Sequence, residues 1–382
     1  MVSFLAKSVN SLAQNKLKEE KMSQKKRYGV LEMDEEQQKR LDRLVKVGKP
    51  FHQVDPELKE MILQQRKDKP RIIDIHCHPY TKVGWRSLGK FRVHLEKYLY
   101  KKEATPESVT EEAPTDEEWV QVFREYGAVC TPVGWDAETT MAPGDPLYQS
   151  NSNDYIASLR DRFPDVVITG WGCVDPWKGW RALEEAVRCI KELKLVGLKF
   201  QQVGQAFMVS DKRFYPLWDL CQEMGIPIQL HSGYTGLGSG APGGMGTKLK
   251  YTMNLIPDFD DLAADFPNLK IIMLHPSDGR DEDAVLICRH KGNVFRELSG
   301  MWPEYIPATS PHTWHELNRR QRAKYMFASE FNLFPLDGIL WQHMQLDYRE
   351  GVLEDMFFKN TVRILGEELE RNAGVDLKEW KV

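Results

Sequence analysis

The sequence lacks the features that mark nucleic-acid-binding and membrane-spanning proteins. Its 52 lysines and arginines are outnumbered by 56 aspartates and glutamates, so the formal net charge of −4 offers no basic field to a nucleic acid. No apolar run approaches the length of about 20 residues that a membrane-spanning helix needs. We therefore expect a globular protein whose partners include neither a nucleic acid nor a membrane.

Cysteine is also scarce. The six cysteines are spread over positions 77, 130, 173, 189, 221 and 288, and no two of them form a Cys-x-x-Cys pair. This distribution argues against a disulfide framework and is typical of reduced thiols in the cytoplasm. The 382 residues, 41% of them hydrophobic, are enough for one large α/β domain with an appendage or for two ordinary domains.

The chain before residue 70 differs in composition from the rest. Residues 16–27 are rich in lysine, and residues 33–65 repeat leucines, acids and bases at helical spacing. We interpret residues 1–69 as a charged, helical N-terminal extension and residues 70–382 as the main domain. An arm of this kind often covers a neighbouring subunit.

Beyond residue 70, strand-like and helix-like segments alternate. Eight short apolar runs rich in β-branched residues predict strands at 71–76, 128–133, 166–171, 196–200, 227–230, 269–274, 293–298 and 325–328. Helical patterns occupy most of the intervals, at 154–163, 179–194, 215–224, 259–266 and 312–324. Eight strands that alternate with helices over about 300 residues predict a (β/α)8 TIM barrel. A doubly wound open sheet is the alternative, but no Gly-x-Gly-x-x-Gly opens a helix after the first strand.

The first predicted strand ends in two histidines separated by one residue. Side chains alternate along a strand, so His76 and His78 point the same way from Cα atoms roughly 6–7 Å apart. Two imidazoles at that spacing can bind one cation at about 2.1 Å. A hydrogen-bonded structural pair is the alternative for an isolated His-x-His. Cys77 lies between the two histidines and faces the other side, which predicts packing and not metal binding.

Polar side chains also stand at the ends of other predicted strands. In a TIM barrel the reactive groups lie at the C-terminal ends of the strands. The fourth to eighth strands end in or near Lys199, His231, His275, Glu297 and Glu330, in that order. Four of the ten histidines thus fall at predicted strand ends, which favours one shared site over chance.

Several of these segments together resemble a known family. The runs DIHCHP (74–79), GLKF (197–200), IPIQLHSG (226–233), LKIIMLHP (269–276) and FASE (327–330) are similar to those of one group of metal-dependent amidohydrolase-related proteins. That group includes aminocarboxymuconate-semialdehyde decarboxylase and the aromatic-acid decarboxylases. The closing run NTVRILG (360–366) resembles the family's C-terminal helix, so the resemblance covers about residues 70–367.

The resemblance implies a TIM barrel that binds one divalent metal. It implies that His76, His78 and His231 bind this metal together with Glu330, and that His275 faces the substrate. Two positions depart from the family pattern, because the strand-eight acid is usually aspartate and a histidine often stands where this chain has Gln201. The extra methylene of Glu330 moves its carboxylate by about 1.5 Å. Direct binding, binding through water and no binding by Glu330 therefore stay open.

Other residues compete for the metal. Glu297 is a rival carboxylate, and a buried structural acid is the alternative role for it. A carbamylated Lys199 would bridge a second metal, but the resemblance and the strand-one motif favour a single one. Zinc suits three imidazoles and a carboxylate best, and manganese is the alternative.

The resemblance favours nonoxidative decarboxylation of an aromatic or unsaturated carboxylic acid. In that reaction the metal would chelate a substrate oxygen, while His275 supplies a proton or orients the substrate. The alternative is hydrolysis of a C–N, ester, lactone or C–C bond by metal-activated water, with His275 or Glu330 handling the proton. A noncatalytic barrel used for binding or assembly is the third hypothesis. Relatives with this architecture are commonly dimers or higher, so a homo-oligomer is implied.

Four further residues are candidates for substrate binding. Arg280 and Lys199 are candidates to bind the carboxylate of a small-molecule substrate, and Trp85 is a candidate to contact a flat substrate. Glu297 is the fourth candidate for substrate binding. Surface salt bridges and core packing are the competing roles for such an arginine and such a tryptophan. The glycine-rich segment 236–246 follows His231 and predicts a substrate lid, with an inert insertion as the alternative.

Overall fold

The structure is a computed structural model that describes residues 52–100, 103–141, 143–149 and 152–377. Most of the predicted N-terminal extension lies outside these ranges. Its described part contains helix α3 (Pro56–Gln65), which begins where the Asp55 side chain accepts the N–H groups of Glu57 and Leu58. The expected helical pattern over residues 33–51 lies outside the described residues, and the division at residue 69 stays a prediction.

Parallel strands form the centre of the described structure. Their bounds are β1 (Ile72–Cys77), β2 (Ala128–Pro132), β3 (Trp171–Gly172), β4 (Gly197–Phe200), β5 (Ile228–His231), β6 (Ile271–Leu274), β7 (Val294–Glu297) and β8 (Tyr325–Met326). Strands β1 and β2 pair with each other, and β3 to β8 pair in sequence order. Every one of these pairings is parallel, as repeated βα units require.

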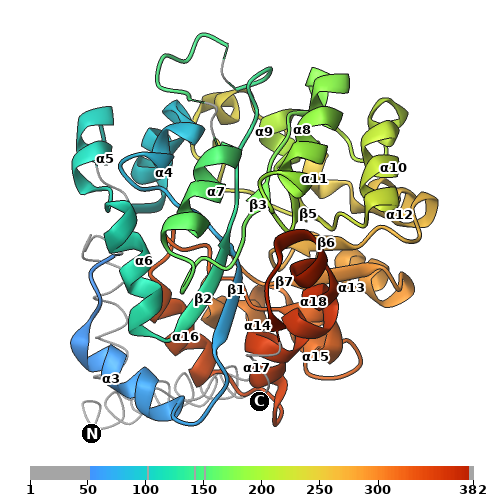
Figure 1. Cartoon of the computed structure of the whole chain (residues 1–382). Helices are drawn as coiled ribbons and strands as arrows, with labels where there is room; N and C mark the ends of the chain where they lie inside the picture. The colour runs from blue at the N-terminus through green and yellow to red at the C-terminus, as the bar shows by residue number, and fades with distance from the viewer. Residues whose placement is uncertain (1–51, 101–102, 142, 150–151, 378–382) are drawn as a thin grey trace, which may run out of the picture.

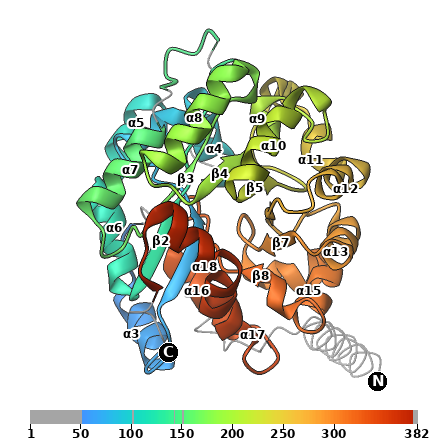
Figure 2. The same ribbon diagram turned by 45° about the vertical axis from the view of Figure 1, so that its right-hand side comes forward.

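Backbone hydrogen bonds also connect the β1–β2 pair to the six-stranded sheet at both of its edges. Between β2 and β3, the Cys130 N–H donates to the Val166 carbonyl over 2.9 Å. Between β8 and β1, the Ile75 N–H donates to the Phe327 carbonyl over 3.1 Å. Helices surround the strands in Figures 1 and 2, which is the arrangement of a (β/α)8 TIM barrel. The predicted fold is confirmed.

Two sets of helices cover the strands. The helices of the outer layer are α6 (Asp116–Glu125), α7 (Ser152–Arg162), α8 (Trp180–Lys191), α10 (Tyr215–Met224), α12 (Leu255–Asp265), α13 (Asp281–His290), α15 (Pro311–Leu317), α16 (Leu336–Gln345) and α18 (Asn360–Ala373). The insertion between β1 and β2 contains a short 3-10 helix (Gly84–Leu88), α4 (Lys90–Tyr100) and α5 (Pro106–Glu112). This insertion rises beside the barrel in Figure 1 and supplies part of the wall of the site described below.

Helix α10 shows how the sequence sets helix boundaries. Pro216 stands in its first turn, where the missing N–H leaves no hydrogen bond unmade. Gly225 follows its last residue with φ +63, in the left-handed region that ends many helices. These two residues explain why the predicted range 215–224 matches the observed helix.

The core lies on both faces of the strands. Ile271 and Met273 of β6 pack in a cluster that contains residues of α8, α10, α12 and α13. Their neighbours Ile272 and Leu274 pack instead with residues of β1, β2 and β8. Strands buried on both faces read as continuous apolar runs, and this property made them visible in the sequence. Cys77 packs with Trp119 and other apolar residues, as expected.

Two predicted elements are shorter than expected. The run at 166–171 bonds to β2 only through isolated bridges such as Cys130 to Val167, and the regular strand β3 covers Trp171–Gly172. The helix predicted at 312–324 ends at Leu317, because the Asn318 side chain donates to the Trp314 carbonyl and caps it.

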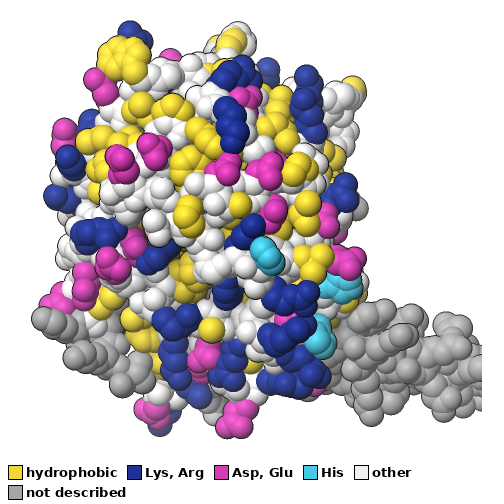
Figure 3. All heavy atoms as spheres, turned by 90° about the vertical axis from the view of Figure 1, so that its right-hand side faces the viewer, with side chains coloured by type: hydrophobic (Ala, Val, Ile, Leu, Met, Phe, Trp, Pro, Cys, Tyr) yellow, Lys and Arg dark blue, Asp and Glu magenta, His cyan; other side chains and the backbone are white. Residues whose placement is uncertain are grey.

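The outer face over α10, α12, α13 and α15 carries charges of both signs, and its lower edge gathers lysine, arginine and histidine side chains (Figure 3). His290 of α13 and His312 and His315 of α15 are exposed. None of the described helices is both long and apolar enough to cross a membrane.

Candidate active site

A cavity of about 370 Å³ lies at the C-terminal ends of the strands. His76, Lys199, His231, His275 and Glu330 all contribute to its wall. Most of the remaining wall is aromatic or aliphatic and includes Tyr80, Leu88, Leu95, Tyr98, Trp135, Tyr234, Leu237, Met301, Trp302, Tyr305, Leu333 and Phe334. The volume suits one small molecule that contains a ring.

Strand β1 positions its two histidines through the backbone. The His76 N–H donates to Asp74 Oδ1 over 3.1 Å, and the His76 carbonyl accepts from the Glu330 N–H over 3.0 Å. The imidazole centroids of His76 and His78 are 5.0 Å apart, in agreement with the strand alternation. Tyr80 stacks on His78 with ring centroids 4.7 Å apart, which limits rotation of the His78 ring.

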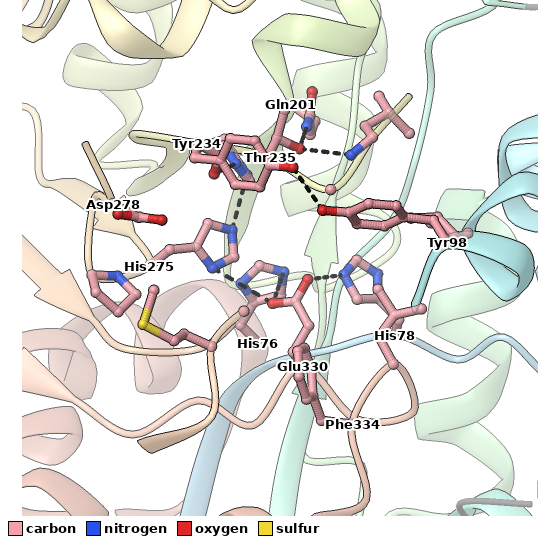
Figure 4. A pocket seen from close by; sticks show the side chains of 18 of the residues that line it. His76, His78, Tyr98, Gln201, Tyr234, Thr235, His275, Asp278, Glu330 and Phe334 are labelled. Carbon is pink, nitrogen blue, oxygen red and sulfur yellow. Dashed lines mark hydrogen bonds and ion pairs between the residues drawn. The ribbon is translucent and has the colours of Figure 1, made fainter. Parts of the chain in front are cut away.

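The Glu330 carboxylate lies among the histidines (Figure 4). One carboxylate oxygen is 3.1 Å from His78 Nε2, and the other is 3.8 Å from His76 Nε2 and accepts from Ser299 Oγ over 2.7 Å. The backbone of Glu330 has φ +59, a conformation that residues with a β-carbon rarely adopt. Such conformations concentrate at functional sites, where the surrounding structure maintains them.

His231 and His275 form a hydrogen-bonded pair. Nε2 of His275 is 2.9 Å from Nδ1 of His231. The other nitrogen of each ring, here called the outer nitrogen, faces a backbone carbonyl. His275 Nδ1 is 2.9 Å from the Ser299 carbonyl, and His231 Nε2 is 3.2 Å from the Tyr234 carbonyl. A carbonyl only accepts, so both outer nitrogens carry hydrogen. Two neutral rings then present two bare lone pairs to each other, and only an extra proton or a cation stabilises that contact.

Glu297 lies behind the cluster, and it is not part of the cavity wall. Its side chain is fully buried, and Oε1 is 3.3 Å from His76 Nδ1 and accepts from the His275 N–H over 2.9 Å. The hydrogen bond to Glu297 directs the His76 Nδ1–H away from the cavity. His76 Nε2 is then buried without a hydrogen-bond partner among the described residues. A buried ring nitrogen in this state is a ready ligand for a cation.

Burial and neighbouring charges set the protonation of the cluster. Desolvation lowers the pKa of His78 to about 3 despite the nearby Glu330 carboxylate. Desolvation, together with the charge of His275, lowers the pKa of His231 well below its ordinary value. Burial alone would raise the pKa of Glu330, but His76 and His275 hold it well below its usual range. Burial therefore favours the neutral form of His78 and His231, while the carboxylate of Glu330 is ionised at neutral pH.

This donor set fits a divalent metal. One ring nitrogen each of His76 and His275 and one oxygen of Glu330 lie within 4.8 Å of one another. Donors that bind one cation at about 2.0–2.2 Å are separated by comparable distances. This group includes His275, for which the family resemblance implied a substrate-facing position. His78 contacts the group through Glu330, and His231 contacts it through His275.

Lys199 supplies a buried positive charge to the cavity wall. Its side chain is 2% exposed, and Nζ lies 4.8 Å from the centre of the Trp135 ring. Among the described residues, no carboxylate oxygen lies within 4.0 Å of Nζ, and burial lowers the lysine pKa. The neighbouring Gln201 takes no part in the cluster, because its amide donates to Thr235 Oγ1 over 3.0 Å.

Three of the four expected substrate contacts do not line the cavity, namely Glu297, Trp85 and Arg280. Trp85 is fully buried in an apolar cluster that includes Phe91 and Leu95. Arg280 is exposed at the start of α13, where its Nε donates to the Met253 carbonyl over 2.8 Å. Packing within the β1–β2 insertion accounts for the place of Trp85, and the turn before α13 directs Arg280 outward.

Some site residues escaped the sequence analysis. Ser299 contacts both Glu330 and His275, and Gly300 lies against the His275 ring. They stand two and three positions after Glu297, so the rule that polar residues after strands form the site would have found Ser299. Tyr98 belongs to an insertion helix whose sequence gives no sign that it reaches the cavity.

Comparison with known proteins extends these observations. A sequence profile of the amidohydrolase family matches residues 73–366. Comparison with curated protein sequences gives no match. Among solved structures, an uncharacterized TIM-barrel protein from Bordetella bronchiseptica has a TM-score of 0.59 at 17% sequence identity, and the likeness covers 78% of this chain and 99% of that protein.

Two enzymes share the fold at low identity. The 5-carboxyvanillate decarboxylase of Novosphingobium aromaticivorans, solved with manganese and 4-hydroxy-3-methoxy-5-nitrobenzoic acid, has a TM-score of 0.56 at 15% identity over 79% of this chain and 97% of that one. A probable 2-pyrone-4,6-dicarboxylic acid hydrolase of Acinetobacter baumannii, solved with citric acid, has a TM-score of 0.52 at 13% identity over 78% and 99%. These likenesses agree with the TIM barrel. Because the family profile spans most of the sequence, including the strands that carry the histidines and Glu330, this chain belongs to the amidohydrolase family.

Proposed function

We propose that this protein is a metal-dependent, nonoxidative decarboxylase of an aromatic or unsaturated carboxylic acid. The observation that carries the proposal is the pairing of a histidine and carboxylate cluster with a buried cation in one aromatic cavity. His76, His275 and Glu330 would hold the metal, with His78 and His231 beside them. Zinc suits the donor set best, and the manganese of a decarboxylase with this fold makes manganese the alternative.

Lys199 would bind the substrate through its charge. A buried ammonium without a carboxylate partner gains an ion pair when an anionic ligand enters, so a carboxylic acid is the favoured substrate class. Trp135 beneath the ammonium and Phe334 offer flat apolar surfaces to a ring or a conjugated chain.

The reaction requires one proton transfer to carbon. A divalent metal, when bound, supplies a Lewis acid that polarises the substrate near the bond to be broken. The bond between the ring carbon and the carboxyl carbon breaks, carbon dioxide leaves, and the electron pair stays on the ring carbon. The new C–H bond forms with a proton taken up from water, and His275, as one of the residues that hold the metal, orients the substrate for this step.

Hydrolysis is the second candidate function. The Glu330 carboxylate is ionised and lies at the cavity wall, so it can accept a proton from an attacking water. A probable hydrolase shares this fold, which supports the alternative.

The test combines metal analysis with an assay of carbon dioxide release. Purified full-length protein, loaded with zinc or with manganese, would be given hydroxylated and amino-substituted aromatic acids. We expect about one metal per chain and carbon dioxide release from at least one acid. The His275→Asn variant should lose release while it keeps its fold, and the Arg280→Ala variant serves as a matched control outside the cavity. Metal binding without release from any acid favours hydrolysis, and a chain that takes up no metal favours the noncatalytic barrel.

A further inference from the structure

Two tyrosines from distant parts of the chain meet over the cavity. Tyr98 lies on α4, in the insertion between β1 and β2, and Tyr234 lies on the loop after β5. Their hydroxyl oxygens are 2.9 Å apart. Both side chains line the cavity, yet Tyr98 is 37% exposed and Tyr234 is 41% exposed, so the pair stands at the boundary with solvent. In Figure 4 both rings lie above the histidine cluster.

We propose that the Tyr98–Tyr234 pair is the gate of the cavity and that the two hydroxyls must separate before a ligand enters or leaves. This inference rests on the proposed function only for the identity of the ligand. The gate itself is a property of α4 and the loop after β5.

The hydrogen bonds of the gate have a fixed direction. Ser239 Oγ donates to the Thr235 carbonyl over 2.9 Å, because a carbonyl only accepts. The Tyr234 hydroxyl, which contacts Ser239 Oγ, therefore donates to it. Tyr234 must then accept from Tyr98, so Tyr98 is the outermost donor of the chain. Loss of the Tyr98 hydroxyl removes one hydrogen bond, whereas loss of the Tyr234 hydroxyl removes two.

A second contact attaches the same two segments. His94, one turn before Tyr98 on α4, places Nε2 at 2.6 Å from the Ser239 carbonyl and donates to it. Gly240 permits this close approach, because a β-carbon there would lie 3.0 Å from the Tyr98 ring. Helix α4 and the loop are thus joined at His94 and at the tyrosine pair.

The loop combines a hydrogen-bonded base with a glycine-rich outer part. Thr235 accepts a hydrogen bond from Gln201, the residue that follows β4, and beyond Thr235 the glycines at 238, 240, 243, 244 and 246 all have positive φ. Segments of this kind change backbone conformation at low cost. A partly exposed hydroxyl pair gives little net stabilisation, so thermal motion opens it readily. The gate therefore consists of a loop with several flexible glycine positions and of one hydroxyl–hydroxyl hydrogen bond that contributes little stability.

The experiment measures access to the metal cluster. Zinc-loaded full-length protein would be mixed with excess dipicolinate, and the rate of zinc removal followed in the wild type and in the Tyr98→Phe and Tyr234→Phe variants. Loss of one such hydrogen bond should raise the rate about threefold to tenfold in Tyr98→Phe, with a larger rise in Tyr234→Phe. Tyr305→Phe is the matched control, because Tyr305 lines the same cavity outside the pair. Unchanged rates in both variants, or an equal rise in the control, would overturn the gate.

A second measurement needs no metal. Amide hydrogen exchange in residues 234–247 of the zinc-free protein should be faster in both variants than in the wild type, since the loop loses one of its two attachments to α4 and keeps only the contact with His94. Unchanged exchange there would contradict the proposal. A protein that retains no zinc counts against the proposed function. In that case the hydrogen-exchange measurement alone tests whether the tyrosine pair holds the loop.

Discussion

His275 Nε2 lies 2.9 Å from His231 Nδ1, while the outer nitrogen of each ring faces a backbone carbonyl. The two carbonyls fix a hydrogen on each outer nitrogen, so the inner pair has room for one proton or one cation. Desolvation lowers the pKa of both rings, which disfavours the extra proton at neutral pH. The pair is thus prepared to bind a cation.

Replacement of His231 by phenylalanine should weaken zinc binding by more than about tenfold, because the inner lone pair and its support of His275 are lost together. Competition with a fluorescent zinc chelator at pH 7.5 measures the affinity. His315→Phe is the control, since His315 is exposed on α15. Equal zinc affinity in the wild type and the His231 variant would show that the pair has no part in metal binding.

Replacement of Lys199 by methionine should separate ligand binding from stability. The substitution removes a buried cation that has no carboxylate partner among the described residues, so thermal stability without ligand should stay equal or rise. Binding of benzoate should weaken about tenfold or more, because the charge that attracts the carboxylate is gone. Calorimetric titration and thermal unfolding give the two quantities. A variant that binds benzoate as tightly as the wild type would show that Lys199 does not bind the carboxylate.

Trp85 should behave as a core residue. Trp85→Ala should lower the free energy of unfolding by about 3–5 kcal/mol, because it leaves a large void in a fully buried cluster. Trp85→Phe should cost less than Trp85→Ala, because the phenyl ring fills part of the void and the buried indole N–H has no hydrogen-bond partner to lose. Urea unfolding measures both values. A Trp85→Ala variant with full stability and impaired substrate binding would restore the role expected from the sequence.

His343 should make stability depend on pH. Burial lowers its pKa from the ordinary 6.5 to about 3, so the folded protein resists a proton that the unfolded chain accepts. The stability that this neutral ring provides is complete above pH 6.5 and is lost as the pH falls toward 3. Between pH 7.5 and pH 5 the wild type should lose about 2 kcal/mol more than His343→Phe, which cannot titrate. Urea unfolding at both pH values tests this. Parallel losses in the two proteins would show that His343 does not carry the effect.

The strand order and the residues at the strand ends were predictable because both depend on local pattern. Parallel strands buried on two faces form apolar runs, and their C-terminal ends meet at one edge, so the alignment of His76, His231 and His275 followed from spacing alone. Strand β3 was less predictable, because the run at 166–171 divides its hydrogen bonds between two neighbouring strands.

The parts of the site that depend on long connections could not be read from the sequence. Trp85 and Tyr98 belong to the same insertion, yet Trp85 packs inside it and Tyr98 reaches the cavity. Nothing in the local pattern distinguishes them. The inclusion of His275 in the group closest to Glu330 also depends on side-chain positions that only the folded chain determines.

Gly300 lies beside the catalytic candidate His275, with φ +76, and a β-carbon there would lie 2.6 Å from His275 Nδ1. Even alanine at this position would push the imidazole away from the Ser299 carbonyl that orients it. Laboratory evolution for new substrates should therefore yield no substitutions at position 300. The next two positions, Met301 and Trp302, line the cavity with side chains that can be exchanged, so libraries aimed at altered substrate preference belong there.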